Sequence, residues 1–537
     1  MTYGTGRNRT SGPWSPLRNH PTGSLMRTPV SPPTAVTVDL AAGDRRIETA
    51  ISTVILAGDR AWKIRKPVVF PFLDQRTPGR QRRLCVREVE LNSRLAADVY
   101  LGVVDIDDPP SGGVRPATLM RRLPDGQRLG ARIAAGVDVR SEIREIARTL
   151  AAFHLRANCG PLIAQSASPV AIARRWHDSL SVVERFTDTV LESRTVAAVR
   201  ALADEYIAGC TPLLHHRMAT DKVVDGHGDL LVDDVFCLSD GPRILDCLEF
   251  SDDLRYCDVV SDVASLAMDC ERLGAPGLSD LLLREYASYT ADTFPTSLAE
   301  HYIAYRAVVR CEVACLRHEQ GDAGSADTAR LLLDLAHRHC LLARPTLVLV
   351  GGPPGVGKTT VAAAVGDVLG WTVLRSDEVR REVLGGDQWA GSAEWLSTRF
   401  SAAATEATYT EMVERAGRLL GLGESVVLDA TWSAAPRRDE AERIARDSRA
   451  AFVALRCDAP ASVAEQRVGR RIAAGSDISL ATVAVARQIA QSFAPWPRAV
   501  ALDTAAPVAE TLSQALDAIR LVGLRDPTPS EHREVTC

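Results

Sequence analysis

The stretch Gly352-Pro-Pro-Gly-Val-Gly-Lys-Thr359 decides the fold of the second half of this 537-residue chain. It matches the pattern G-x-x-x-x-G-K-S/T in full, with the strand-like run Thr346–Val350 before it and the Ala-rich helical run Thr360–Leu369 after it. Glycines let successive backbone N–H groups point into one concavity, and a helix N-terminus adds its positive dipole. The stretch therefore predicts a phosphate-binding loop. A plain glycine turn would not require Lys and Thr at the last two positions.

In such a loop Lys358 reaches the β- and γ-phosphates of a nucleotide, and the Thr359 hydroxyl ligates Mg²⁺. We therefore expect ATP and Mg²⁺ as cofactors and treat Lys358 as catalytic as well as nucleotide-binding. The residues assigned to the nucleotide here are Gly352, Gly355, Gly357, Lys358, Thr359 and Thr360.

Strand-like and helical runs alternate from Pro345 onward, which predicts an α/β doubly wound parallel sheet. The strand-like runs are Thr346–Val350, Thr372–Leu374, Val426–Leu428, Phe452–Leu455 and Ala499–Leu502. We place this P-loop domain at residues 343–525, followed by a tail at 526–537. It joins the first half of the chain without a Gly- or Ser-rich linker.

Asp377 follows the second predicted strand, at the edge where open parallel sheets bind ligands. A carboxylate there can take the proton of an attacking hydroxyl, and Arg380, one helical turn later, can hold an anionic substrate group. The alternative for Asp377 is a helix N-cap, which Ser376-Asp377-Glu378 also suggests.

Two further features complete the predicted site of this domain. Asp429 ends the run Ser425–Asp429, which has the shape of a Walker B strand, and it can hold the Mg²⁺ shell through water. Arg467, Arg470 and Arg471 share a predicted helix, where they either close over the phosphates as a lid or form a solvated face. We include Arg467 and Arg471 among the nucleotide-binding residues.

These motifs resemble those of P-loop kinases of the group that includes gluconate kinase, zeta toxins and the kinase half of polynucleotide kinases. In that group the Asp after the second strand activates the acceptor hydroxyl, so the resemblance assigns that role to Asp377. It does not identify the acceptor.

The first half of the chain combines a β region with helices and an acid-rich segment. Thr53–Ala57 and Ala61–Lys66 flank Gly58-Asp59, a strong hairpin signal, and Gln81–Ala97 reads as a helix with apolar Leu84, Val89, Leu91 and Leu95. Eleven acidic residues lie between 225 and 262, around a second hairpin formed by Val235–Leu238 and Arg243–Asp246. Carboxylates around buried strands favour Mg²⁺, whereas a solvated loop surface is the alternative. Asp258, Asp262 and His154 are expected to be structural.

His227-Gly228-Asp229, followed by this hairpin, is similar to the catalytic loop of aminoglycoside phosphotransferases and choline-kinase-type enzymes, which share the protein-kinase fold. The resemblance implies an α+β protein-kinase-like domain over residues 36–342, with Asp229 as the catalytic base and Asp246 as a metal ligand. It also implies that a lysine of the first hairpin pairs with Glu88 or Glu90 to hold phosphates. Lys63 is the first candidate for this lysine, and Lys66 is the second. Met120–Pro124 would be the hinge between the lobes.

Two positions depart from that family. The second metal ligand of the family is an Asn, and Asp234 stands in its place. Glu48-Thr49-Ala50-Ile51-Ser52 occupies the position of the glycine-rich loop. A nucleotide-binding pseudokinase is therefore an alternative for this domain.

The whole layout resembles actinobacterial proteins that join a phosphotransferase-like domain to an ATP-binding P-loop domain. It predicts an ATP- and Mg²⁺-dependent phosphotransferase in which the P-loop half is the surer catalyst. The rival interpretations are a regulatory ATPase whose first domain binds a partner, and a binding module that senses a small metabolite.

Composition agrees with a globular protein and constrains its partners. Lys and Arg total 63 against 68 Asp and Glu, a net charge of −5, which gives no overall attraction for nucleic acid or membrane. We therefore expect a small-molecule hydroxyl acceptor, favoured over a nucleic-acid 5′-hydroxyl, and no obligate protein partner. Twelve scattered cysteines without metal-type spacing indicate a reducing cytoplasm. Residues 1–35, rich in Pro, Ser and Thr, are expected to be a disordered tail.

Overall fold

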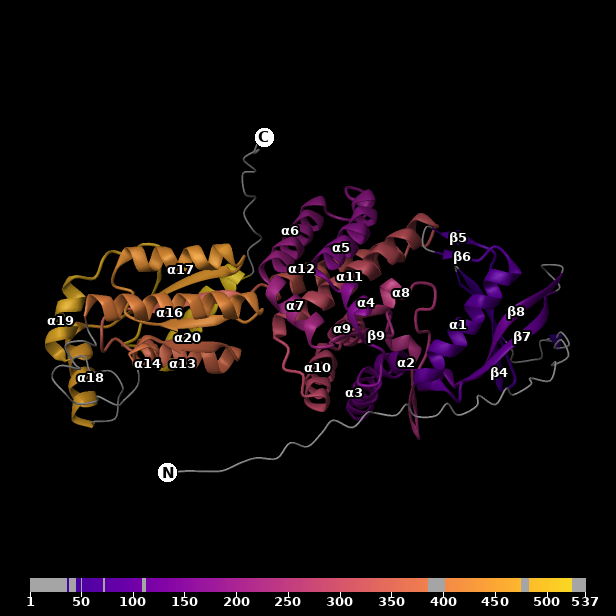
Figure 1. Cartoon of the computed structure of the whole chain (residues 1–537), viewed down its shortest axis with the longest axis horizontal. Helices are drawn as coiled ribbons and strands as arrows, with labels where there is room; N and C mark the ends of the chain where they lie inside the picture. The colour runs from indigo at the N-terminus through magenta and orange to yellow at the C-terminus, as the bar shows by residue number, and fades with distance from the viewer. Residues whose placement is uncertain are drawn as a thin grey trace, which may run out of the picture.

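The computed structural model describes residues 36–37, 45–49, 51–70, 73–108, 113–384, 401–474 and 482–523. The tails predicted at 1–35 and 526–537 lie outside these ranges. Two bodies lie end to end in Figure 1, the first from β1 to α12 and the second from β13 to α20. None of the described helices is long and apolar enough to span a membrane.

A six-stranded sheet in the order β1-β7-β8-β4-β3-β2 opens the first domain. All its pairings are antiparallel except that of β1 with β7. The strands are β1 (Val36–Thr37), β2 (Arg45–Glu48), β3 (Ser52–Ala57), β4 (Arg60–Arg65), β7 (Tyr100–Asp108) and β8 (Gly113–Arg121), and a separate small hairpin contains β5 (Val69–Phe70) and β6 (Leu73–Asp74). The predicted hairpin of β3 and β4 is confirmed. Its turn includes Gly58, whose φ of 54° favours glycine.

Helix α1 (Pro78–Ala96) packs on this sheet, and the Thr77 side chain caps its first turn. Its buried face is partly polar and consists of Gln81, Cys85, Glu88, Leu91, Asn92 and Ala96. The predicted helix is confirmed. Of its four apolar residues Leu91 is fully buried, and Val89 and Leu95 are half-buried and pack against the apolar cores. The polar residues of the buried face serve the site described below.

Helices form most of the remaining first domain around one large apolar core that includes Leu150, Trp176 and Leu180. They are α2 (Leu129–Ala134), α3 (Arg140–His154), α4 (Pro161–Gln165), α5 (Pro169–Val183), α6 (Ser193–Gly209), α7 (Thr211–Ala219), α8 (Asp252–Arg255), α9 (Val259–Arg272), α10 (Pro276–Thr290), α11 (Thr296–Glu319) and α12 (Ser325–Leu342). Short 3-10 turns occupy Asp125–Gln127, Glu184–Phe186 and Val232–Asp234. The acid-rich segment forms two antiparallel pairs, β9 (Val223–Asp225) with β12 (Tyr256–Asp258) and β10 (Val235–Leu238) with β11 (Gly241–Ile244). The second pair is the predicted hairpin.

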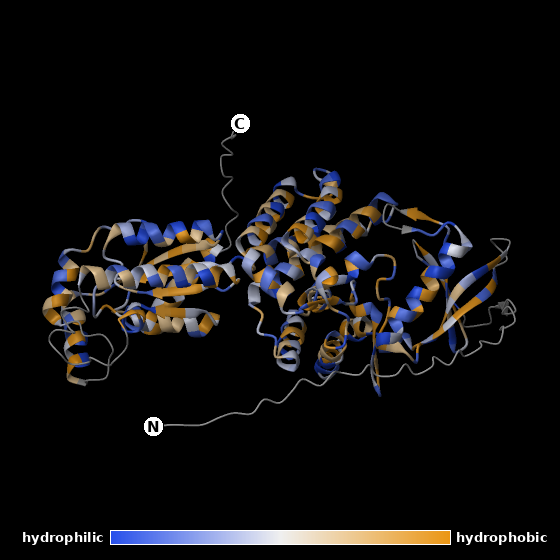
Figure 2. Ribbon diagram, in the orientation of Figure 1, coloured by the Kyte–Doolittle hydropathy of each residue, from blue (hydrophilic) through white to orange (hydrophobic). Residues whose placement is uncertain are grey.

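A parallel five-stranded sheet in the order β14-β15-β13-β16-β17 forms the second domain. The strands are β13 (Thr346–Gly351), β14 (Thr372–Arg375), β15 (Val426–Asp429), β16 (Ala451–Asp458) and β17 (Val500–Asp503), each close to its predicted range. The helices are α13 (Lys358–Leu369), α14 (Ser376–Val383), α16 (Ala402–Gly421), α17 (Ala435–Asp447), α18 (Ala461–Ala474), α19 (Val483–Gln491) and α20 (Val508–Gly523). Separate apolar cores form around this sheet, and Figure 2 shows its hydrophobic strands among helices with hydrophilic surfaces. The predicted doubly wound α/β fold is confirmed.

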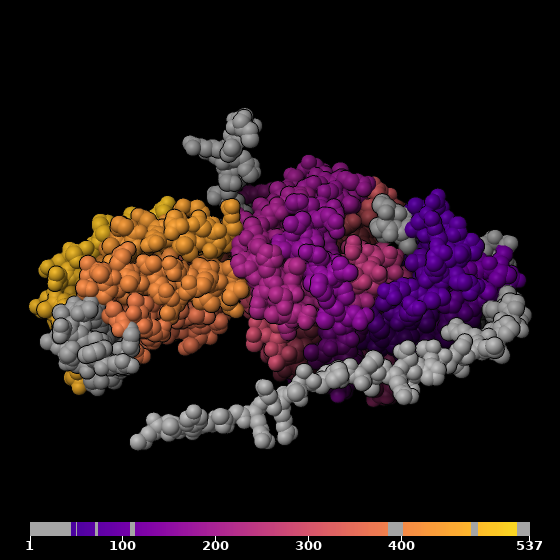
Figure 3. All heavy atoms as spheres, in the orientation of Figure 1, coloured from indigo at the N-terminus to yellow at the C-terminus, as the bar shows by residue number. Residues whose placement is uncertain are grey.

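The two domains meet at a joint where glycines allow close approach. A Cβ atom added to Gly209, the last residue of α6, would lie 2.4 Å from the Ser448 carbonyl oxygen. One added to Gly423, just before β15, would lie 2.6 Å from the Ser297 Oγ, which itself donates a hydrogen bond of 2.7 Å to the Gly423 carbonyl. The chain crosses between the domains in three residues, from α12 to β13. Figure 3 shows the two domains in contact at this joint.

A buried histidine links three helices of the first domain close to this crossing. His339 on α12 lies with its Nε2 2.9 Å from Glu271 Oε2 on α9, and its Nδ1 contacts Glu300 on α11. Burial alone would lower the pKa of His339, but the hydrogen bonds and charges of the two glutamates outweigh it and raise the pKa to about 8. The imidazolium form therefore contributes to the packing of these helices.

Candidate active site

The phosphate-binding loop lies between β13 and α13, as predicted, and its glycines adopt conformations that other residues avoid. Gly355 and Gly357 have φ angles of 88° and 95°. A Cβ atom at Gly355 would lie 2.4 Å from the Ala464 carbonyl oxygen on α18. The loop therefore needs glycine both for its curvature and for the approach of α18. The Lys358 Nζ donates a hydrogen bond of 3.0 Å to the Pro353 carbonyl across the loop.

The neighbouring parallel strands β13 and β15 bring Thr359 and Asp429 together. The Thr359 hydroxyl donates a hydrogen bond of 2.7 Å to Asp429 Oδ2. Burial raises the pKa of Asp429, and this effect outweighs the nearby charge of Lys358, which would lower it. Burial lowers the pKa of Lys358. A buried carboxylate beside a hydroxyl is an oxygen-ligand pair suited to Mg²⁺, so these two residues fit the implied metal.

A cavity of about 430 Å³ opens beside the loop, and six of the predicted site residues of this domain line it. Asp377 lies in the first turn of α14 and lines this cavity together with Lys358 and Thr359. Arg375 is the N-cap residue of α14, and no side chain makes a capping hydrogen bond there. The alternative that Asp377 is the helix cap is therefore not supported. Arg380 and Asp429 line the same cavity.

The three predicted arginines of α18 have different surroundings. Arg471 lines the cavity, whereas Arg467 donates a hydrogen bond of 2.9 Å to the Thr504 carbonyl, close to Gly357. Arg470 is exposed. Of the three arginines, one therefore lines the cavity, one packs beside the phosphate loop, and one faces solvent.

Several cavity residues were not found from the sequence. Arg375 lies at the carboxyl end of β14, a position that the strand pattern could have indicated. Tyr409 and Arg437 lie on α16 and α17 and belong to no motif. The cavity is also lined by Pro354, Ser376, Thr405, Ala430, Thr431, Ser433, Val485, Gln488 and Ile489.

In the first domain the structure brings Lys63 of β4 into contact with two carboxylates. Its Nζ lies 2.9 Å from Glu88 Oε1 and 2.5 Å from Asp246 Oδ1. Burial opposes the charged form, but Asp246 and Glu88 outweigh it and raise the pKa of Lys63. Lys63 is thus the hairpin lysine of this site.

Glu88, not Glu90, is the helix partner of Lys63. Glu88 is fully buried and also accepts hydrogen bonds from Arg65 and Thr118, at 2.9 Å and 2.8 Å. Glu90 is exposed and lies 3.5 Å from Arg87, so the assignment of Glu90 to nucleotide binding was wrong. The second candidate lysine, Lys66, pairs instead with Glu48 at 2.8 Å.

The loop His227-Gly228-Asp229 is held from behind by buried side chains. Asp262 accepts hydrogen bonds from the backbone N–H groups of His227 and Gly228, and it lies 3.3 Å from His154 Nε2. Arg310 on α11 lies 3.3 Å from Asp229, which is half-buried. Asp262 and His154 are therefore structural, as predicted.

Asp258 is structural as well. Its side chain accepts a hydrogen bond of 2.8 Å from the Val260 N–H at the start of α9, and it pairs with Arg217.

The departures from the phosphotransferase pattern have visible consequences. Burial, then the charges of Asp246 and Asp229, raise the pKa of Asp234. At the position of the glycine-rich loop, Thr49 Oγ1 donates a hydrogen bond to the Ser52 carbonyl and accepts one from the Ser52 N–H, each of 2.9 Å. The Lys66 ammonium donates a hydrogen bond to the Thr49 carbonyl. The turn before β3 is therefore held by side chains rather than built from glycine.

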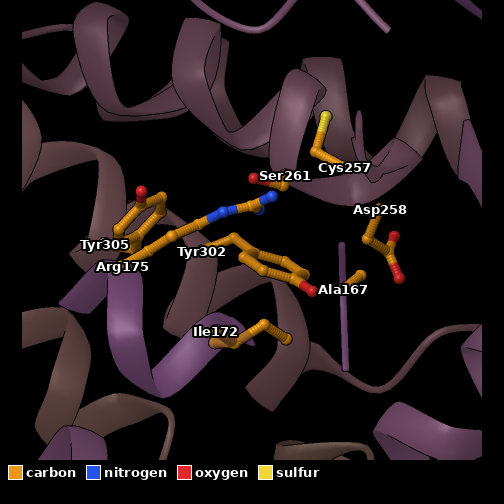
Figure 4. Close-up of a pocket in the computed structure, with 8 residues that line it drawn as sticks. All are labelled: Ala167, Ile172, Arg175, Cys257, Asp258, Ser261, Tyr302 and Tyr305. Atoms are coloured by element: carbon orange, nitrogen blue, oxygen red, sulfur yellow. The ribbon is translucent and has the colours of Figure 1, made fainter. Parts of the chain in front are cut away.

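A second hollow lies among α5, β12, α9 and α11 and is lined by Arg175, Cys257, Asp258, Ser261, Tyr302 and Tyr305 with Ala167 and Ile172 (Figure 4). Its volume is about 10 Å³, room for no more than one water molecule. Arg175 extends through it and donates a hydrogen bond of 3.2 Å to the Tyr256 carbonyl. The hollow is too small for a substrate. Among the described residues no group of three or more His, Cys, Asp or Glu side chains is arranged to hold a metal ion by itself.

Comparison with known proteins agrees with this two-part reading. Residues 68–295 match the phosphotransferase enzyme family, and residues 347–496 match the family described as AAA domain. The fold and the two sites thus define a protein that joins an aminoglycoside phosphotransferase-like domain to a P-loop kinase-like domain, as the sequence predicted.

The chain belongs to a family of two-domain proteins that includes Rv2004c of Mycobacterium tuberculosis H37Rv. It is 42% identical to that protein over 469 residues, which cover 87% of this chain and 94% of the relative. Mb2027c of Mycobacterium bovis matches with the same identity and coverage.

Solved structures are similar to each half separately. A gluconokinase from Sinorhizobium meliloti 1021 is 20% identical, with 33% of this chain and 94% of that chain covered and a TM-score of 0.26. The APS kinase of Mycobacterium tuberculosis is 22% identical, with 33% and 98% covered and a TM-score of 0.26. A choline/ethanolamine kinase family protein from Mesorhizobium loti is 16% identical, with 56% and 93% covered and a TM-score of 0.37.

Proposed function

We propose that this protein is an ATP- and Mg²⁺-dependent phosphotransferase that transfers a γ-phosphate to a hydroxyl acceptor in the P-loop domain. The observation that carries the proposal is the shared cavity, where Asp377 faces the same space as Lys358 and Thr359. A carboxylate in that position can accept the proton of a hydroxyl that attacks the γ-phosphate.

The residues of the cavity have complementary roles in this proposal. When bound, MgATP supplies the phosphoryl group and a cation that neutralises part of its charge. Lys358 donates hydrogen bonds to phosphate oxygens, while Thr359 and Asp429 hold the cation. Asp377 accepts the proton of the acceptor hydroxyl as the hydroxyl oxygen bonds to the γ-phosphorus and the bond to ADP breaks. Arg380 and Arg471 offset the negative charge of the reacting groups.

The first domain supports a second candidate function. Lys63, Glu88 and Asp246 form the arrangement expected to hold nucleotide phosphates, and Asp229 would be its base. Asp234 and the turn without glycines distinguish it from an active phosphotransferase of that family. The alternative is a nucleotide-binding regulatory ATPase whose first domain is a pseudokinase that binds a ligand or partner.

All described cysteines are free, which supports a cytoplasmic location.

The test is acceptor-dependent formation of ADP by the purified full chain. Hydroxyl metabolites and 5′-hydroxyl oligonucleotides are screened with MgATP. Asp377→Asn should lower acceptor phosphorylation by about a hundredfold with ATP affinity retained, because the amide cannot accept the proton. The control is Glu382→Gln on the same helix, where Glu382 is exposed and pairs with Arg415 at 2.5 Å.

Two outcomes would contradict the proposal. ADP formation that no acceptor stimulates would favour the regulatory ATPase. Full transfer by Asp377→Asn would show that Asp377 is not the base.

A further inference from the structure

A short turn directly after Asp429 connects the end of β15 with the phosphate loop. It consists of residues 430–433 and is called here the post-β15 turn. Thr431 and Ser433 of this turn line the cavity. The Gly352 N–H, at the start of the phosphate loop, donates a hydrogen bond of 3.1 Å to the Thr431 carbonyl. The shape of the turn therefore bears both on the loop and on the carboxylate proposed to hold Mg²⁺.

The backbone of the post-β15 turn is strained at Trp432. Its φ angle is 51°, in the left-handed region that bulky side chains rarely adopt. Residues in such conformations persist only where their surroundings over-determine them, and they cluster at functional sites. The Trp432 side chain is fully buried, and its Nε1 donates a hydrogen bond of 3.2 Å back to the Leu428 carbonyl. The turn is thus held by its neighbours in a conformation that its own sequence does not favour.

Tyr409 on α16 supplies hydrogen bonds that hold this turn. Its hydroxyl lies 2.9 Å from Thr431 Oγ1 and accepts a hydrogen bond of 3.3 Å from the Trp432 N–H. The rings of Tyr409 and Trp432 also meet edge to face, with their centroids 5.0 Å apart. Because Tyr409 is only 4% exposed, water is a poor substitute for its hydroxyl. One phenol oxygen therefore contacts two successive residues of the turn, at the strained position.

Arg437 of α17 holds the ring of Tyr409 in place. Its guanidinium lies 4.4 Å from the ring centroid and is 3.6 Å from Glu406, which is also on α16. The ring thus contacts both Arg437 and Trp432, and neither contact involves the hydroxyl. A change of Tyr409 to Phe therefore removes the two hydrogen bonds to the turn and leaves the packing of the ring.

We propose that Tyr409 is a positioning residue of the nucleotide site in the P-loop domain. Its hydroxyl holds the post-β15 turn in the strained conformation. In that conformation the Thr431 carbonyl meets the Gly352 N–H, which fixes the start of the phosphate loop relative to Asp429. Tyr409 acts on the nucleotide through the turn. The inference rests on the nucleotide site of the proposed function, and it is independent of the acceptor.

The first experiment measures nucleotide affinity without turnover. The full chain is titrated by calorimetry with a non-hydrolysable ATP analogue and Mg²⁺, at a temperature at which the wild type and all variants are folded. The binding that Lys358→Ala abolishes defines the share of the P-loop domain. Tyr409→Phe and Thr431→Val each remove one hydroxyl and should weaken this binding about fivefold or more, because the released turn no longer fixes the loop. Thr431→Ser keeps the hydroxyl and should bind within about twofold of the wild type. The control is Tyr289→Phe, at an exposed tyrosine of α10.

The second experiment asks whether the two hydroxyls act as one unit. Each single change removes the same hydrogen bond between Tyr409 and Thr431, so the second change has little left to remove. The double variant Tyr409→Phe/Thr431→Val should therefore bind the analogue about as tightly as Tyr409→Phe alone. Two hydroxyls that served separate purposes would instead give losses that multiply.

The outcomes separate positioning from a purely structural role. Wild-type affinity in either single variant overturns the inference even if the Tm falls, because the hydroxyls would then serve stability alone. Losses that multiply in the double variant, or a Thr431→Ser variant as weak as Thr431→Val, overturn it as well. If Tyr409→Phe does not fold, the comparison of the two Thr431 variants decides.

These measurements are also distinct from the test of the proposed function. Absence of any binding that Lys358→Ala abolishes contradicts both the inference and the P-loop assignment. The expected affinities, in a protein whose ADP formation no acceptor stimulates, would support the role of Tyr409 and contradict the phosphotransferase proposal.

Discussion

The stability of the first domain should depend on pH through His339, which is 4% exposed between Glu271 and Glu300. Its pKa rises from 6.5 in the unfolded chain to about 8 in the folded protein. One pKa unit corresponds to about 1.4 kcal/mol, so the charged form adds about 2 kcal/mol of stability. Because the folded pKa is the higher one, this contribution is fully present below pH 6.5 and is lost as the pH rises through about 8.

Thermal unfolding of the full chain at closely spaced pH values from 6 to 9 tests this prediction. His339→Gln should lower the Tm by roughly 4 to 8 °C at pH 6, since 1 kcal/mol shifts the Tm of a large domain by about 2 to 4 °C. The difference between the variant and the wild type should shrink as the pH approaches 9. His177→Gln is the control, because His177 lies in an exposed pair with Asp204. A difference that stays constant from pH 6 to 9 would refute the reasoning.

Three further predictions concern the two sites and the joint. Lys358→Ala should lower ATP turnover at least a hundredfold, because it removes the cation proposed to contact the phosphates, and it should not lower the Tm. Near-normal turnover would exclude the P-loop as the main catalytic centre. Asp234→Asn, tested by ATP titration in the Lys358→Ala background, should tighten ATP binding at low Mg²⁺, because it removes a carboxyl group whose charged form is opposed by burial and by the charges of Asp246 and Asp229. Weaker binding at both low and high Mg²⁺ would instead make Asp234 an adapted ligand. Gly423→Val should destabilise the full chain by about 2 kcal/mol or more in denaturant unfolding, because its side chain meets Ser297 and its φ of +80° disfavours valine. Gly469→Val on α18, which meets no atom within 4 Å, should change the stability by less than about 1 kcal/mol, because valine has a higher helix propensity than glycine. Equal effects of the two substitutions would mean that the joint can relax.

The sequence was sufficient where local pattern and chemistry coincide. The loop Gly352–Thr359 requires a strand before it and a helix after it, and the alternation of runs predicted all five strands of the second sheet. Asp377 and Asp429 were found because parallel strands end at one edge, so residues far apart in the chain share that edge. The hairpin around Gly58 followed from its turn residues.

Other residues depend on helix phase, which local pattern did not resolve. Glu88 and Glu90 are both acids, but two positions on a helix differ by about 200° in direction, so only one can face Lys63. The buried face of α1 contains Gln81, Cys85, Glu88 and Asn92 beside Leu91, and a rule that places only apolar residues inside misses these polar members.

Tyr409 and Arg437 could not be predicted for a different reason. They lie on separate helices and belong to no sequence motif. Their contact with each other and with the cavity arises only when α16 packs against β15 and α17 packs against α16 and β16. The positions of these cavity side chains are set by tertiary packing, whereas the positions of the phosphate-loop residues follow from their order in the chain.

The glycine contacts at the joint also bear on how the two halves can be exchanged between relatives. At Gly209 and at Gly423, an atom of the opposite domain lies so close that a β-carbon would not fit. The surface of each domain at the joint is therefore shaped to the surface of the other. In a hybrid assembled from two relatives, the domains would pack together only if both surfaces of the joint came from one parent. Recombination at the three-residue crossing before β13 would separate these matched surfaces, so such a hybrid should be less stable than either parent.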